Sequence, residues 1–187
     1  MKADDARQRE DGRLMERIAR GEPDAWREMV DKELSGACSL AGRLLHDAAE
    51  AEEVVQEAFA ALHGTAPHWR EEACVATWLY RVVRNRCLDR LRRTREETGL
   101  EGYAEQPSSW GNPDEALQAK ERHCGLETAL QALPERWRSA ILLVYHLDRS
   151  GEEAAQILGV TPEALESLLG RAKRRLRELL WSRRGDL

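Results

Sequence analysis

The segment from residue 150 to residue 177 constrains the fold most, because it contains two helix starts eleven residues apart. Ser150 and Glu153 have the spacing of a capping box, in which each side chain satisfies a backbone N–H group of the other. Gly159 ends this short helix, and Thr161 then begins a longer one as its N-cap. The second helix becomes strongly basic over residues 171–177. This order is typical of a helix-turn-helix, although plain helical hairpins share it.

The rest of the chain also has a helical pattern. Leu, Ala, Arg and Glu dominate the 187 residues and β-branched residues are scarce, which favours helices over sheets. Residues 94–113 differ, because they contain Gly, Pro, Ser and several acids without apolar periodicity. The sequence therefore predicts an all-α protein of two small helical domains, 11–93 and 114–182, joined by a flexible acidic linker. Further helices are expected over 11–20, 23–46, 48–63, 76–93, 114–133 and 136–147.

Charge is distributed in blocks, although the formal net charge is only −5. Residues 47–57 hold five acids and no Lys or Arg, whereas residues 78–95 hold seven Arg and one acid. A second basic block covers residues 171–184, where seven bases accompany Glu178. Such alternation predicts separate surfaces for separate partners.

Several classes of protein are disfavoured. Cys38, Cys74, Cys87 and Cys124 are far apart, and with the histidines they match no common zinc spacing. Neither a Gly-rich phosphate loop nor a nucleophile–base arrangement is evident in the sequence, so we expect no enzyme activity, no metal and no cofactor. The polar start and the lack of a long apolar run predict a cytoplasmic protein without membrane insertion.

Several motifs, in the same order along the chain, resemble those of one family. Residues 47–59, DAAEAEEVVQEAF, resemble the polymerase-binding stretch of region 2 in extracytoplasmic-function (ECF) sigma factors. Residues 76–93 resemble the promoter-reading helix of the same region. Residues 133–136, 152–159 and 171–177 resemble region 4. The resemblance covers about residues 24–180 and implies a region 2-like domain followed by a region 4-like helix-turn-helix domain.

The acidic block is the expected polymerase-binding surface. An acidic helix face is often only solvated, but here the resemblance implies docking on the β′ clamp helices of RNA polymerase core, with the β flap as a further contact. The candidate core-binding residues are Asp47, Glu50, Glu53, Gln56 and Glu57.

The Arg-rich helix and the loop before it are the expected surface for the minus-ten promoter element. Arginines supply phosphate contacts, and Asn85 is expected near base edges. Trp69 is the preferred ring for stacking on an unpaired base, whereas Trp78 and Tyr80 are expected to be core rings. The candidate residues are His68, Trp69, Arg81, Arg84, Asn85 and Arg92.

The second helix of the helix-turn-helix is expected to read the minus-thirty-five element from the major groove. Its candidate residues are Thr161, Glu163, Ala164, Ser167, Arg171, Lys173 and Arg174. This helix departs from the family pattern, since Glu166 and Leu168 stand where a Lys and an Arg are usual. Gly151 replaces a common aromatic residue, and Gly170 replaces a common polar one.

The resemblance implies an ECF sigma factor that directs core polymerase to specific promoters and initiates transcription. Its expected partners are core polymerase, promoter DNA and an anti-sigma factor. Two alternatives stay open at this point. One is a helix-turn-helix regulator that binds duplex DNA without polymerase, and the other is a sigma-like interaction protein without promoter-specific DNA binding.

Overall fold

The computed structural model describes residues 2–70, 73–98 and 125–182, and all regular structure within these ranges is helical. The expectation of an all-α protein is thereby confirmed. The chain divides into two compact units, Met1–Arg90 and Leu91–Leu187, and each is described by itself. The elements are α1 (Lys2–Ala19), α2 (Pro23–Leu45), α3 (Ala48–Thr65), η1 (Ala66–His68), α4 (Val75–Thr98), α6 (Glu135–Ile141), η2 (Leu142–His146), α7 (Gly151–Leu158) and α8 (Pro162–Ser182).

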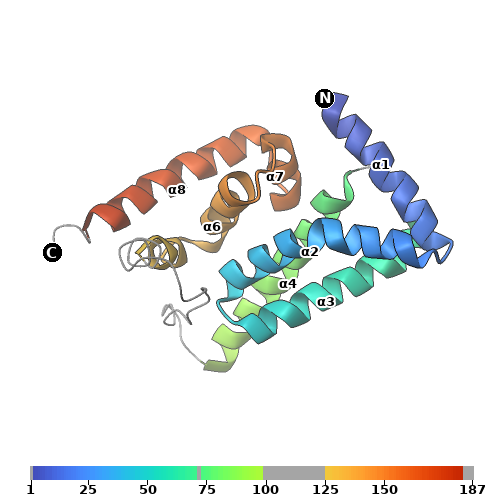
Figure 1. Cartoon of the computed structure of the whole chain (residues 1–187). Helices are drawn as coiled ribbons and strands as arrows, with labels where there is room; N and C mark the ends of the chain where they lie inside the picture. Colours follow the sequence, from blue (N-terminus) through green and yellow to red (C-terminus); the bar gives the residue numbers. More distant parts are fainter. Residues whose placement is uncertain (1, 71–72, 99–124, 183–187) are drawn as a thin grey trace, which may run out of the picture. The chain divides into compact units, whose positions relative to one another are not determined.

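The first unit is built around the antiparallel pair α2 and α3, which lie side by side in Figure 1. Helix α1 packs against α2 and against the short 3-10 turn η1. The core between these helices and α4 is aliphatic, and its fully buried members come from all four helices. They include Met15, Met29, Leu40, Leu44, Leu62, Leu79 and Val83.

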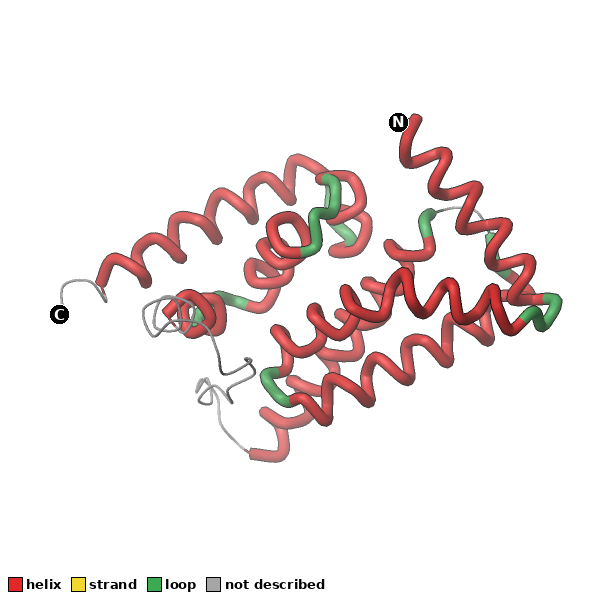
Figure 2. The backbone as a smooth tube through the Cα atoms, viewed as in Figure 1, coloured by secondary structure: helices red, strands yellow, loops and turns green. Residues whose placement is uncertain are grey.

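The α2–α3 connection is tight because both helix ends are capped within two residues. His46 adopts the left-handed conformation (φ 57°), and its N–H donates to the carbonyl of Gly42. Asp47 follows as the N-cap of α3, where its Oδ1 accepts the N–H of Glu50 at 3.0 Å. Figure 2 shows the α2–α3 connection as a short green turn.

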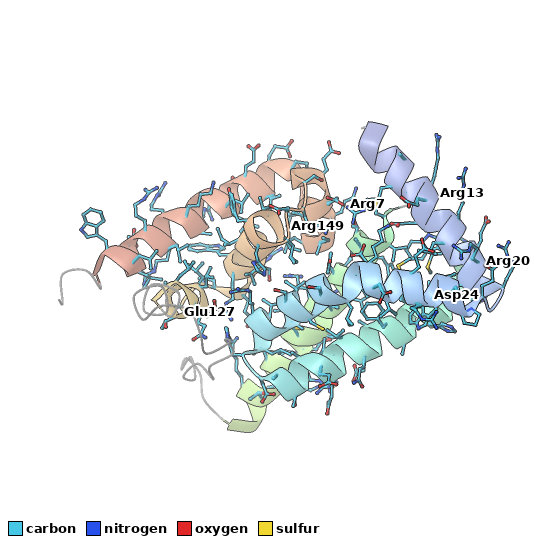
Figure 3. All side chains as sticks on the ribbon, viewed as in Figure 1. Arg7, Arg13, Arg20, Asp24, Glu127 and Arg149 are labelled. Atoms are coloured by element: carbon cyan, nitrogen blue, oxygen red, sulfur yellow. The ribbon has the colours of Figure 1, made fainter. Side chains whose placement is uncertain are left out.

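A buried polar contact fixes α4 against α2. The hydroxyl of Tyr80 donates to Glu33 Oε2 at 3.1 Å, and Arg7 of α1, labelled in Figure 3, reaches Glu33 Oε1 at 3.5 Å. The ring lies so close to α2 that a Cβ on Gly36 would stand 2.1 Å from the Tyr80 hydroxyl. Residue 36 must therefore be a glycine for Tyr80 to reach Glu33 in this arrangement.

After the end of α4, the second unit continues in the described part of the chain with a helical stretch over residues 125–131. Its apolar cluster contains Leu130, Leu133, Ile141 and Ala172, against which Trp137, Leu169, Leu176 and Leu179 pack. Arg138 is buried beside it and donates from Nη2 to the carbonyls of Gln131 (2.7 Å) and Leu133 (3.3 Å). This contact supplies donors to carbonyls left over at the end of the preceding helix.

Helices α7 and α8 form the expected helix-turn-helix. The capping box is present, since Ser150 N donates to Glu153 Oε2 at 2.9 Å and Glu153 N donates to Ser150 Oγ at 3.2 Å. Arg149, also labelled in Figure 3, lies 3.9 Å from the other oxygen of Glu153. Gly159 ends α7 with φ 66°, a conformation that glycine adopts without a Cβ clash.

Some helix ends differ from expectation. Helix α1 begins at Lys2 rather than near residue 11, and α4 continues to Thr98, so that the first residues of the predicted linker are helical. The helix expected over 136–147 is α6 followed by a π-helical turn, in which Leu147 N bonds to Leu142 O five residues back. The remainder of the predicted linker 94–113, and residues 114–124 of the next predicted helix, lie outside the described residues.

Candidate functional site

Three of the predicted core-binding carboxylates form one row on α3, here called the acidic row: Glu50, Glu53 and Glu57. Their spacing places them on one side of the helix, facing α4. Arg90 of α4 donates hydrogen bonds to all three. Its Nη1 donates to Glu50 and to Glu53 (3.1 Å to Glu53), and its Nη2 donates to Glu57 at 2.9 Å. Arg86, one turn earlier on α4, also donates to Glu57. The acidic row is therefore already paired with two guanidinium groups within the chain.

The electrostatic effect of the acidic row is visible at Arg90. The hydrogen bonds that Arg90 donates to Glu53 and then to Glu50 hold the pKa of Arg90 above its ordinary value, so it remains a cation. Its side chain is 24% exposed, whereas those of Glu50, Glu53 and Glu57 are 43–63% exposed. The carboxylates keep open oxygen lone pairs toward solvent, because each carboxylate can accept several hydrogen bonds.

The other two predicted core-binding residues lie elsewhere on α3. Gln56 is on an outer row with Glu52, to whose Oε1 it donates at 3.1 Å. Within the described part of the chain, no cation pairs with Glu52. Asp47 is exposed, but its carboxylate is engaged as the N-cap of α3. The helix thus offers a paired acidic row and an outer row with a carboxylate free of ion pairs.

The predicted minus-ten residues divide between the turn η1 and helix α4. His68 is exposed at the end of η1, and Trp69 follows it half-buried. The ring of Trp69 meets that of Trp78 edge to face, with centroids 6.2 Å apart and planes at 76°. Tyr80 is a core ring as expected, but Trp78 is only half-buried. The half-buried aromatic pair therefore lies at the first turn of α4, which carries Trp78.

The arginines of α4 do not share one surface. Arg81, Asn85 and Arg92 are exposed and fall on one side of the helix by their spacing. Arg84 is 7% exposed, and its Nη1 donates to Asn85 Oδ1 at 3.3 Å. Charge counting along the sequence could not separate these roles, because it ignores which helix face each residue occupies.

The N-terminal half of α8 is acidic where the predicted DNA contacts lie. Thr161 Oγ1 accepts the N–H of Ala164 at 3.2 Å and so caps the helix. The pKa of the exposed Glu163 is lowered by its own backbone N–H and then by Thr161. Glu166 and Ser167 are exposed beside them, and the basic residues Arg171, Lys173 and Arg174 begin only in the following turns. Lys173 lies over the ring of Tyr145, 4.7 Å from its centroid.

Sequence reasoning missed two sets of residues. Arg86 and Arg90 were visible as an i, i+4 pair of arginines opposite acids spaced at i, i+3, i+7, but the packing of α3 on α4 was needed to pair them. Asp11 of α1 accepts the N–H of Val75 at 2.8 Å and binds Lys32 at 2.7 Å. No local sequence pattern indicates a contact between residues so far apart in the chain.

The three cysteines within the described ranges show no sign of a reactive site. Cys38, Cys74 and Cys87 are not in disulfides, and Cys124 lies outside the described residues. Burial raises the pKa of Cys87 to about 12 and, with the charge of Glu52, raises that of the half-buried Cys38. In the described ranges no three metal-binding side chains of the His, Cys, Asp or Glu type gather at one place. None of the described helices has both the length and the apolar character to cross a membrane.

Comparison with known families matches two segments of the chain in order. Residues 29–97 match the family model of Sigma-70 region 2, and residues 125–176 match that of Sigma-70 region 4. Together they cover well over half of the chain. The first segment contains the acidic row and α4, and the second contains the helix-turn-helix.

Individual relatives agree with this. The ECF RNA polymerase sigma factor SigW of Bacillus subtilis is 26% identical over 176 residues, which are 89% of this chain and 94% of the relative. SigM of Mycobacterium tuberculosis, also described as an ECF RNA polymerase sigma factor, is 33% identical over 131 residues, 70% of this chain and 64% of the relative.

Two solved structures share the fold. The sigma factor RpoE of Bartonella quintana, solved with the anti-sigma factor NepR, superposes with a TM-score of 0.64 at 26% identity, covering 82% of this chain and 95% of that one. CnrH, solved with the cytosolic domain of CnrY, gives a TM-score of 0.70 at 22% identity over 92% and 97% of the two chains.

Proposed function

This chain belongs to the ECF sigma factors of RNA polymerase, and from that premise we propose how its surfaces divide the work of initiation. As an ECF sigma factor, it directs core polymerase to specific promoters and starts transcription there. In the proposed division, α3 docks on core polymerase, α4 with the η1 loop takes the minus-ten element, and α8 contacts the minus-thirty-five element.

The observation that carries the proposal is the juxtaposition of an acidic helix and an arginine-bearing helix in the region 2 segment. Carboxylates of α3 retain open lone pairs for a basic partner, such as the β′ clamp helices. The cations Arg81 and Arg92 are exposed on α4 for phosphates. Opposite charges on adjacent helices suit a protein that binds polymerase and DNA at the same time. A contact of the second unit with the β flap belongs to the same proposal.

Such a factor does not have to catalyse a reaction itself to initiate transcription. Contacts to unpaired bases offset the lost pairing and stacking of the duplex, and each stacked base contributes about 1–3 kcal/mol. Sigma factors are in general non-enzymatic initiation factors, and we propose the same for this chain. We also propose that the chain acts in the cytoplasm, where polymerase and promoter DNA are found.

We further propose that an anti-sigma factor binds this chain. Support comes from RpoE, which was solved in complex with the anti-sigma factor NepR and is 26% identical in sequence to this chain. A protein that covers the acidic row or the exposed side of α4 would block polymerase or promoter binding directly.

In vitro transcription tests the proposal. Core polymerase is incubated with genomic fragments, with and without the chain, and we expect discrete new start sites that depend on it. A helix-turn-helix regulator would bind the fragments without core polymerase and create no new starts. A sigma-like interaction protein would bind core polymerase without selecting promoters, and either outcome would overturn the proposal.

Core docking has its own test. Glu53→Gln with Glu57→Gln should weaken core binding by about tenfold, because two charge-assisted contacts are lost. Glu52→Gln, on the outer row of the same helix, is the matched control. If the control variant loses as much affinity as the double variant, the acidic row is not the docking surface.

A further inference from the structure

The carboxylate of Asp11 is one of the most deeply buried charges in the first unit. Its side chain is 1% exposed and lies between three helices. It accepts the backbone N–H of Val75 at 2.8 Å and the ammonium group of Lys32 at 2.7 Å. Asp11 belongs to α1, Lys32 to α2 and Val75 to α4, so one side chain ties three elements together.

The contact with Val75 supplies a helix cap from a distant part of the chain. Val75 is the first residue of α4, where backbone N–H groups have no partner within the helix. The preceding residue is Cys74, a poor N-cap compared with Asp, Asn, Ser or Thr. Asp11, 64 positions earlier, provides the acceptor instead, and its negative charge also suits the positive end of the helix dipole.

This cap lies at the beginning of the surface assigned to the minus-ten element. The first turn of α4 carries Trp78, whose ring supports Trp69 edge to face at 6.2 Å. Helix α1 also packs on η1, which directly precedes Trp69. Asp11 and its helix therefore hold both the turn before Trp69 and the helix turn on which the Trp69 ring rests.

We propose that Asp11 is a positioning residue for minus-ten recognition: it fixes the first turn of α4, and through Trp78 the ring of Trp69, in the geometry that receives an unpaired base. This inference rests on the proposed function of the η1–α4 surface. Asp11 precedes residue 29, where the region 2 match begins. It does not touch DNA, and its effect passes through a backbone N–H and two aromatic rings.

The variants separate this role from a general loss of stability. Asp11→Ala removes the acceptor, whereas Asp11→Asn keeps an oxygen for the N–H of Val75 and loses only the charge. Lys32→Gln removes the ion pair and leaves the cap. Leu44→Ala, at a fully buried position in the last turns of α2, is a destabilising control that leaves Asp11, Lys32 and Val75 unchanged.

The measurement is base discrimination by the holoenzyme. The reference probe is a fork junction from a promoter found in the transcription assay. The ratio is the dissociation constant of a single-base minus-ten variant of this probe divided by that of the probe itself. An inactive fraction of protein affects both constants alike, so it leaves the ratio unchanged. We expect Asp11→Ala to lower the ratio by about fivefold, and Asp11→Asn, Lys32→Gln and Leu44→Ala to change it by less than about twofold.

A double variant tests whether the effect of Asp11 on discrimination acts through the ring of Trp69. In a Trp69→Ala background, Asp11→Ala should cause no further loss of discrimination, because the ring that it positions is gone. An unchanged ratio for Asp11→Ala, or an equal loss for Asp11→Asn, would overturn the inference while wild-type discrimination stands. If Trp69→Ala itself leaves the ratio unchanged, the proposed minus-ten surface is wrong and the inference falls with it.

Discussion

Arg90 of α4 donates to Glu57 of α3 at 2.9 Å, and the same guanidinium group also serves Glu50 and Glu53. The helix expected to bind DNA thus neutralises part of the helix expected to bind polymerase. A basic partner that docks on the acidic row meets carboxylates that are held in place, which lowers the entropy cost of ordering them. The same pairs also join α3 to α4 and contribute to the stability of the unit.

The effect of a charge reversal on the stability of the unit should therefore depend on which row of α3 carries the change. Glu57→Lys removes contacts with Arg86 and Arg90 and places a third cation beside them, whereas Glu52→Lys changes a residue that no cation pairs with in the described structure. We expect the first change to lower the free energy of unfolding by about 1 kcal/mol more than the second, since partly exposed pairs are individually weak. Urea unfolding at low and high salt measures this difference, which should shrink as salt rises. Equal losses at low salt would contradict the pairing.

On α4, exposure separates two arginines that look alike in the sequence. Arg81→Ala should reduce the salt dependence of minus-ten DNA binding by about one unit of slope, because one phosphate contact is lost. Arg84 is buried against Asn85, so Arg84→Ala should mainly lower the free energy of unfolding and leave the slope unchanged. Holoenzyme titrations of fork-junction DNA between low and moderate salt measure the slopes. If Arg84→Ala reduces the salt dependence and Arg81→Ala does not, Arg84 rather than Arg81 contacts the phosphates.

The close approach at Gly36 provides a test of the α2–α4 packing. An alanine Cβ there would stand 2.1 Å from the Tyr80 hydroxyl and 3.1 Å from its Cζ. Gly36→Ala should cost about 1–3 kcal/mol of unfolding free energy, and less in a Tyr80→Phe background, where the hydroxyl is absent. Gly64→Ala is the control, because open space surrounds that position in α3 and alanine is the better helix former. Stabilisation by Gly36→Ala, like that expected at Gly64, would contradict the contact.

The sequence predicted what depends on neighbouring residues and missed what depends on tertiary contacts. The capping box of Ser150 and Glu153 could be predicted because its partners are three residues apart. The N-cap formed by Asp47 was not predicted, although its partner Glu50 is also only three residues away. Asp47 was interpreted only as a polymerase-binding residue. The Asp11–Val75 contact and the Arg90 cluster could not be found, because the packing of the helices brings these residues together. The burial of Arg84 was missed for the same reason.

The buried thiol of Cys87 predicts a loss of stability at alkaline pH. Its pKa is about 12 in the folded protein, against an ordinary value of 9.0. Below about pH 9 both states hold the proton and the thiol has no effect on the pH dependence of stability. Between about pH 9 and 12 the unfolded chain releases the proton and the folded chain keeps it, so unfolding becomes easier by up to about 1.4 kcal/mol per pH unit. Cys87→Ala should show a shallower decline over this window in urea unfolding, and an identical decline would contradict the assignment.

The last prediction concerns the unusual acid on α8. Glu166 is exposed on the half of the helix expected to approach DNA, and the exposed Glu163 nearby stays ionised because its pKa is lowered. Residues 162–170 hold these two carboxylates and no Lys or Arg, so this stretch opposes phosphate binding, and the helix N-terminus is already capped by Thr161. Simple repulsion is therefore favoured over a hydrogen bond from cytosine N4 to Glu166, although the second contact is chemically possible.

Glu166→Lys should then tighten binding to all minus-thirty-five sequences and increase the salt slope by about one unit, because a lysine at this position gains a phosphate. Glu178→Lys, which makes the same charge change near the far end of α8, controls for the general effect of net charge. Holoenzyme titrations over single-base variants of the element measure both quantities. If Glu166 reads a cytosine, the substitution would instead lower discrimination at one base pair by about 1–3 kcal/mol without general tightening. That pattern would mean that the departure from the family sequence changes which promoters this factor selects, whereas general tightening would mean that it weakens the upstream contact and leaves selection to the minus-ten surface.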